Sequence, residues 1–331
     1  MKGRRLIIWL MYLLPVPVML VSLCVGPSAG PGFTESLEYL FRILSGTADD
    51  EVLKTILLDV RLPRVLLAFM TGGALAVSGT ALQAVFRNPL VSPYIMGLSS
   101  GAAFGAALAL AWVWLPVQIS AFVFGLLAVA LSYMAALRHG QVSVVSLILS
   151  GVIVGGIFTA LLTIVQFVSD PFKLQSIVHW TMGNLHNTGW KALNSVYIPV
   201  ILSVVVLIIF RWKLNVIALG DEEARTSGVN PTLIKMVILI AASLASSAVV
   251  SVAGVIGLFG LIVPHMVRMM VGPDNQTSLP VNFLFGGMFL LIIDDFSRTI
   301  AHFEIPIGIF TMLIGAPFFL YLMKKTKTGW E

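Results

Sequence analysis

The sequence contains a single cysteine, Cys24, among its 331 residues. One cysteine excludes a disulfide within the chain and a cysteine-rich metal centre. Cys24 also lies in an apolar run, where a free thiol packs as a small hydrophobic side chain and is chemically inert. We also expect the chain to hold no metal.

Charged residues are also scarce, at 11% of the chain, against about 25% in a soluble domain. Hydrophobic residues make up 58%, and the mean hydropathy is +0.98. Such a chain cannot cover its own surface with polar side chains, so a membrane is its natural solvent. The net charge of +5 does not indicate nucleic-acid binding, because the basic residues lie at the ends of apolar runs, where membrane topology requires them.

Two further absences exclude whole classes of function. The sequence has no Walker A glycine loop, so the chain does not bind ATP in that way. No ionisable side chain falls in the middle of an apolar run, which disfavours a secondary carrier driven by protons or sodium. An intramembrane aspartyl protease is disfavoured too, since the neighbours Asp294 and Asp295 project about 100° apart on a helix.

Long apolar runs dominate what is present. A helix needs about 20 mostly apolar residues to cross a bilayer. The pattern predicts an all-α polytopic membrane protein, a single transmembrane domain over residues 1–331, with about ten helices. The first run is expected to be an uncleaved span rather than a signal peptide. The predicted spans are 6–26, 62–84, 93–114, 116–137, 141–168, 192–211, 232–253, 255–271, 280–300 and 305–323.

The positive-inside rule orients these spans. With the N-terminus inside, 13 of the 20 basic residues fall on the cytoplasmic side and 7 outside. We therefore expect both termini in the cytoplasm. The long outer loop 27–61 shows helical apolar spacing and predicts one or two amphipathic helices on the outer surface.

Small residues and a few charges indicate how the spans pack. Glycines recur every four residues at Gly97, Gly101 and Gly105, which favours close helix contacts in lipid. The run GVIGLFGLIVP (254–264) predicts an irregular or re-entrant segment buried in protein. Asp294 and Arg298 are one turn apart and are expected to pair, with Asp295 pointing elsewhere.

One charged segment interrupts the apolar pattern. Residues 218–231 read ALGDEEARTSGVNP and lie between two predicted spans, on the cytoplasmic side. Gly220 and Gly228 allow sharp turns at either end of it. Asn230 and Pro231 then predict the start of the next helix, because proline suits a first helical turn.

Three sequence blocks carry a recognisable pattern. The first is RLPRVLLAFMTGGALAVSGTALQAVFRNPLVSPYIMGLSSGAAFG (61–105). The second is AGVIGLFGLIVPHMVRMMVGPD (253–274), and the third runs from IIDDFSRTI to EIPIGIFTMLIGAPFFLYLM (292–323). All three resemble the permease subunits of iron-chelate and vitamin B12 ABC importers, and with the ten-span pattern the resemblance covers essentially the whole chain. It implies a single transmembrane permease domain over residues 1–331 with the type II ABC importer permease fold.

The resemblance also implies partners. Such permeases are homodimers around a central path, in the cytoplasmic (inner) membrane. Two ATP-binding subunits, which bind ATP and magnesium, dock on the cytoplasmic side, and a periplasmic or lipid-anchored substrate-binding protein docks outside. The permease itself is then a transport subunit rather than an enzyme, and it binds no cofactor.

Functional residues follow from the same resemblance. The segment 216–230 is similar to the family's coupling helices, which sit in a cleft of the ATPase. The implied coupling residues are Leu219, Gly220, Glu222, Ala224, Arg225 and Gly228. The implied docking residues for the binding protein are Arg61, Arg64 and Arg298. The implied inner gate, where valines partly replace the family's small polar residues, is Ser143, Val144, Val145 and Ser146.

The substrate stays open at this point. The family handles ferric siderophores, haem and corrinoids, and a related branch takes molybdate or tungstate. We expect an iron complex. His179 and His186 are seven residues apart, but Gly183 and Asn184 break the helix that would bring them onto one face, so we do not expect them to ligate a metal or haem.

Overall fold

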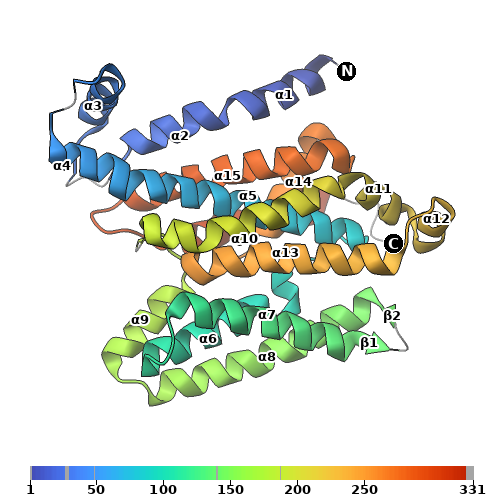
Figure 1. Cartoon of the computed structure of the whole chain (residues 1–331). Coiled ribbons are helices and arrows are strands. Elements are labelled where there is room, and N and C mark those ends of the chain that lie inside the picture. Colours follow the sequence, from blue (N-terminus) through green and yellow to red (C-terminus); the bar gives the residue numbers. More distant parts are fainter. Residues whose placement is uncertain (1, 27–29, 48, 139–140, 187, 326–331) are drawn as a thin grey trace.

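The chain folds into a bundle of long helices that run side by side (Figure 1). The computed structural model describes residues 2–26, 30–47, 49–138, 141–186 and 188–325. A layer of α6 to α9 lies along one side, and α1 and α2 lie along the opposite side. The helices of the first half are α1 (Lys2–Leu13), α2 (Pro15–Cys24), α3 (Phe33–Ser45), α4 (Glu51–Lys54), the π-helix η1 (Thr55–Arg61), α5 (Leu62–Val85), the 3₁₀-helix η2 (Pro93–Met96), α6 (Leu98–Trp112), α7 (Val117–Ala136) and α8 (Val144–Val168).

The second half of the chain continues the bundle. A two-stranded antiparallel hairpin of β1 (Leu137–Arg138) and β2 (Gln141–Val142) links α7 to α8. The remaining helices are α9 (Pro171–Thr181), α10 (Trp190–Ile209), α11 (Arg211–Leu219), α12 (Asp221–Thr226), α13 (Pro231–Ala253), α14 (Phe259–Val271), α15 (Asn275–Thr299) and α16 (Ile307–Lys325).

Each predicted apolar run coincides with a helix or a bent helix pair, which confirms the all-α membrane fold. Six helices are long and apolar enough to cross a membrane, and α1 with α2, bent by 43°, makes up to seven. Three more, α6, α14 and the described part of α16, are apolar but shorter. The predicted count of ten crossings is therefore not confirmed by length alone.

The second span begins earlier than the sequence pattern predicts. We expected 27–61 to be an outer loop with one or two surface helices. Only α3 is a separate helix there, because α4, η1 and α5 join into one helix of 35 residues from Glu51 to Val85. The carboxylate of Asp50 caps its start by accepting from the amides of Val52 and Leu53. A π-helical stretch leads into Pro63, which lies inside this continuous helix and lacks the N–H that would continue its hydrogen-bond ladder.

Helix α5 is the central element of the bundle. It packs against α10, α13, α14 and α15, and it is the most buried of the six long apolar helices. Glycines set its closest contacts: a methyl group on Gly72 would overlap the Gly286 carbonyl of α15, and one on Gly79 would overlap the Gly260 carbonyl of α14. Backbones that approach this closely gain dispersion contacts that larger side chains would prevent.

The glycine-rich run before α14 is irregular, as the sequence predicts. The helix begins at Phe259 rather than 255, and Leu258 just before it adopts a positive φ of 60°. The backbone groups of this stretch find partners inside the protein. The Ala253 carbonyl accepts from the Asn184 amide at 2.8 Å, and the Ile256 amide donates to the Tyr94 hydroxyl at 3.4 Å. Non-helical backbone at membrane depth needs such internal partners.

The α5–α14 contact yields a prediction about stability. Gly79→Ala is expected to lower the free energy of unfolding by about 1–3 kcal/mol, because the added methyl group forces two backbones apart. Gly156→Ala on α8 is the matched control, since nothing lies within 4 Å of a methyl group there. Thermal unfolding of both variants in detergent checks this. Equal midpoints would contradict the close approach at Gly79.

Candidate coupling and docking sites

The charged segment 218–231 folds as a short helix, α12, at one end of the bundle. Gly220 separates it from α11, and a Cβ at Gly220 would collide with the Glu223 carboxylate. Helix α12 ends in a Schellman motif: the Gly228 amide donates to the Arg225 carbonyl, and the Val229 amide donates to the Ala224 carbonyl. Gly228 has a φ of 75°, which glycine adopts without strain. Helix α13 then begins at Pro231 with Asn230 as its N-cap, as predicted.

The six predicted coupling residues divide into a buried pair and an exposed group. Gly220 and Ala224 are buried and hold α12 against the bundle. Leu219, Glu222, Arg225 and Gly228 are exposed, and Leu219 is 73% accessible although it is apolar. These four residues form the exposed face of the α11–α12 corner, and Leu219 is its apolar member.

Neighbouring charges fix the position of α12. Lys235 donates to both Asp221 carboxylate oxygens at 2.7 Å, and Arg87, just beyond α5, lies 3.9 Å from the same carboxylate. Asn215 of α11 donates to Asp274 at the start of α15. A methyl group on Gly272 would lie 3.2 Å from the Arg4 guanidinium, so the N-terminal helix reaches the same place. We call this region, around α12, Arg87 and Asp274, the coupling end.

The three predicted docking arginines lie together at the N-terminal end of α5. A helix of 24 residues is about 36 Å long, which separates them from the coupling end at its C-terminus. We call this region, Arg61, Arg64 and Arg298 with their partners, the arginine end. All three side chains are buried. Arg61 donates to the carbonyls of Leu23, Cys24 and Pro31 and to the Ser36 hydroxyl, and thereby ties α5 to α2 and to the start of α3.

Asp294 is the anion at the centre of the arginine end. Its carboxylate is fully buried and accepts from Nε and Nη2 of Arg64 at 2.9–3.3 Å. Nε of Arg298 lies 3.7 Å away, so the predicted Asp294–Arg298 pair is present. The expectation that Asp295 points elsewhere is wrong. Arg298 also donates to Asp295, because residues three apart share a helix face, and the Ser22 hydroxyl donates to Asp295 at 2.6 Å.

Two further residues belong to this end. The sequence did not single out Glu304, and it brought up His186 only as a possible metal or haem ligand. Glu304, in the connection between α15 and α16, binds Arg64 with both oxygens at 2.9 and 3.1 Å. His186 places Nδ1 3.2 Å from the same carboxylate. Burial alone would raise the pKa of Glu304, but the hydrogen bonds and charge of Arg64, followed by those of His186, hold the pKa below its ordinary value. Glu304 is therefore charged at neutral pH.

His179 and His186 do meet, although not on one helix. Their rings lie 6.5 Å apart in an edge-to-face arrangement, because the chain turns at Gly183 between them. Asn184 contacts His179 and caps the His186 amide. Within the ranges that the structure describes, no group of three His, Cys, Asp or Glu side chains is arranged to hold a metal ion.

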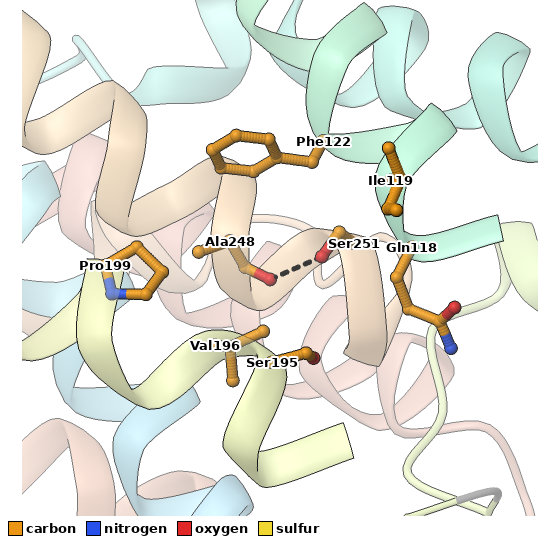
Figure 2. A pocket seen from close by; sticks show the side chains of 8 residues that line it. All are labelled: Gln118, Ile119, Phe122, Ser195, Val196, Pro199, Ala248 and Ser251. Atoms are coloured by element: carbon orange, nitrogen blue, oxygen red, sulfur yellow. Dashed lines mark hydrogen bonds between the residues drawn. The ribbon is translucent and has the colours of Figure 1, made fainter. Parts of the chain in front are cut away.

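Three pockets lie at or near this end. One of about 380 Å³ is bordered by all three arginines, His186 and Glu304. A second, of about 530 Å³, shares His186 and Glu304 and adds His179, Trp180 and Gln118. Figure 2 shows a smaller pocket of about 180 Å³ between α7, α10 and α13. Its lining is mostly apolar, and the Ser251 hydroxyl is bonded to the Ala248 carbonyl, so we assign no polar ligand to it.

The predicted gate residues lie at the start of α8. Ser143 caps the helix by accepting from the Ser146 amide at 3.0 Å, and the two hydroxyls lie 2.8 Å apart. Val144 is half-buried and Val145 is exposed. Helix α8 packs mainly against α6, α7 and η2, and it is the least buried of the six long apolar helices. Its outer face is a row of exposed aliphatic side chains, among them Leu149, Ile153 and Ile157.

Comparison with known proteins decides the family. Residues 14–325 match the FecCD transport family. The chain belongs to this family. A probable iron chelatin transport system permease of Helicobacter pylori is 40% identical over 275 residues, which is 83% of this chain and 84% of that protein. A molybdate import system permease of Haemophilus influenzae is 38% identical over 283 residues, or 85% of this chain and 84% of that protein.

A solved structure supports the same assignment. It is a metal-chelate type ABC transporter in an inward-facing conformation, with 36% identity and a TM-score of 0.83 over 96% of this chain and 99% of that chain. The FecCD chain is thus an ABC importer permease and a multi-pass membrane protein. Because its relatives are permease subunits, the expectation of a transport subunit rather than an enzyme is confirmed.

The arginine end of this FecCD permease yields a second prediction. Asp294→Asn is expected to lower stability by about 3–5 kcal/mol, because it leaves Arg64 and Arg298 with less opposing charge in a buried site. Glu38→Gln is the matched control: it removes one carboxylate from an exposed i,i+4 pair with Arg42, which is worth about 0.3–0.5 kcal/mol. Thermal unfolding compares the two. A loss for Asp294→Asn no larger than for the control would show that Asp294 is dispensable.

Proposed function

We propose that this permease imports an iron complex, delivered by a substrate-binding protein, by alternating access along the axis of a homodimer. The proposal rests on one observation: the coupling end and the arginine end differ in chemistry and lie at the two ends of the same long helix. Helix α5 joins an exposed, charged α12 to a cluster of arginines. A carrier that works without soluble partners does not need a charged docking surface at each end.

We assign the coupling end to the ATP-binding subunits, which bind ATP and magnesium. A water-exposed α12 presents Glu222, Arg225 and the accessible Leu219 to a soluble partner. Beside it lies an open pocket of about 490 Å³, lined by Arg225 and residues 228–232, which offers a hold for a partner side chain. The positive-inside count supports a cytoplasmic position for this end and for both termini.

The arginine end then faces the binding protein. Of the three arginines, Arg64 is best placed for docking, since its outward partner Glu304 is only half-buried and borders two pockets. Arg61 is engaged with α2 and α3, and Arg298 with Asp294, Asp295 and Ser22. Their burial favours a role in positioning this end, with docking carried mainly by Arg64.

We assign the homodimer contact to the uncovered face of α8. Its row of exposed aliphatic side chains is suited to lipid or to a second copy of the chain, and the family resemblance favours the second copy. We assign its Ser143–Ser146 start to the gate at the coupling end of the path. The likeness to an inward-facing transporter supports alternating access.

The substrate is tested through the binding protein. The full chain, solubilised gently from its native membrane after cross-linking, is expected to carry an ATP-binding subunit and a substrate-binding protein, both identified by mass spectrometry. The purified binding protein is then titrated with a ferric siderophore, haem, cobalamin and molybdate. Saturable binding of an iron complex supports the proposal. Preference for molybdate, the substrate of one relative, would replace it with oxyanion import.

The coupling assignment yields a third prediction. Leu219→Ala with Arg225→Ala is expected to reduce co-purification of the ATP-binding subunit by roughly tenfold, because an apolar anchor and a charge are both lost from the exposed face. Lys213→Ala, a basic residue of α11 held over the Phe210 ring, is the control at the same end. Retention of the ATPase by the double variant at the control level would remove α12 from the interface.

A further inference from the structure

Two carboxylates bind Arg64 from two sides, and they differ in burial and in the element that carries them. Asp294 holds Nε and Nη2 from within the rigid helix α15 and is fully buried. Glu304 holds Nη1 and Nη2 from the connection between α15 and α16, and a quarter of its side chain is accessible. The Arg64 guanidinium thus binds Asp294 on its buried edge and Glu304 on the edge that faces the pockets at this end.

The charges of the cluster balance only when Glu304 is counted. Arg61, Arg64 and Arg298 supply three positive charges, and Asp294, Asp295 and Glu304 supply three negative charges. Asp294 and Asp295 belong to a helix packed in the bundle and cannot leave. Glu304 is the one carboxylate whose side chain both reaches Arg64 and borders open space.

Glu304 also has a second partner ready. His186 lies 3.2 Å from the Glu304 oxygen that Arg64 also binds, and more than half of its side chain is exposed. The imidazole lies at the junction of both pockets. When Glu304 turns away from Arg64, it keeps this hydrogen bond and gains water.

We propose that Glu304 is a stand-in for a carboxylate of the docking protein: on docking, a partner carboxylate takes the outward face of Arg64, and Glu304 moves toward His186 and solvent. This inference rests on the proposed function, in which the arginine end receives the binding protein. The exchange keeps the three arginine charges of the cluster balanced by three carboxylates at every stage, so no excess buried charge is left when the binding protein dissociates. Docking is thereby made reversible.

The test measures binding of the substrate-binding protein that the cross-linking identifies to the full-length permease in detergent. Glu304→Asp keeps the charge but shortens the side chain by one methylene group, so it weakens the contacts of the carboxylate with Arg64 and His186. Glu304→Gln removes the charge. Both are expected to tighten docking by roughly threefold or more, because the internal competitor is weakened. Glu38→Asp and Glu38→Gln, on the exposed face of α3, are the matched controls and are expected to leave affinity within about twofold.

The outcomes separate this inference from the proposed function. If the wild-type chain binds and Arg64→Lys weakens binding, but both Glu304 variants bind no more tightly than their controls, the stand-in is overturned and the docking assignment survives. If the wild type does not bind, or Arg64→Lys has no effect, the docking assignment itself fails.

A measurement on the wild-type chain guards against variants that do not fold. Carboxyl groups are labelled with a carbodiimide and glycine ethyl ester, with and without saturating binding protein. Displacement is expected to raise the labelling of Glu304 on docking, while that of buried Asp294 stays constant. A fall in Glu304 labelling would mean that the pair with Arg64 persists beneath the partner, which overturns the exchange.

Discussion

Backbone contact between α5 and its neighbours is the constraint on which the rest of the structure depends. In lipid, apolar side chains gain nothing by leaving one apolar neighbour for another, so close packing has to hold the helices. Gly72 and Gly79 bring α5 against the backbones of α15 and α14. Both ends of the molecule are built on this axis: Arg64 lies in the first turn of α5, and Arg87 follows its last turn.

The same axis explains how a signal can pass between the two ends. Helix α15 runs alongside α5, with Asp274 at the coupling end and Asp294 at the arginine end. These two helices are locked together by glycine contacts and, at the arginine end, by the Arg64–Asp294 pair, so we expect them to move together. Under the proposed function, a displacement of α12, linked to Arg87 and Lys235 through Asp221, reaches the arginine end through this helix pair.

The sequence predicted what depends on local pattern and missed what depends on distant contact. The apolar runs, the Asn230–Pro231 start of α13 and the irregular run before α14 all follow from residues close in sequence. The Arg64–Glu304–His186 cluster joins positions 118 and 240 residues apart, and no local period marks it. A hint was present, since Glu304 is the one acid between the last two apolar runs, immediately before the Ile-Pro of the C-terminal block.

The beginning of the second span shows the same limit in another form. Pro63 and the acids before it mark a natural helix start, and a boundary at Leu62 is the ordinary prediction. The structure instead extends the helix back to Glu51, because η1 widens the turn ahead of the proline and Leu57 within it is fully buried. Tertiary packing of an apolar side chain decided this boundary, and propensity did not.

The two ends also differ in how their charges are satisfied, and this difference matches the partners proposed for them. Within the described part of the chain, Glu222 and Arg225 on α12 take part in none of the ion pairs, so their charges remain available to a partner that stays bound. At the arginine end, Arg64 and Arg298 are already paired inside the chain. A partner carboxylate that binds there replaces an internal one, so the net binding free energy is only the difference between the two ion pairs. We therefore expect moderate affinity and fast exchange at this end. This contrast suits the two partners that we propose, an ATPase that remains in place and a binding protein that delivers its substrate and leaves.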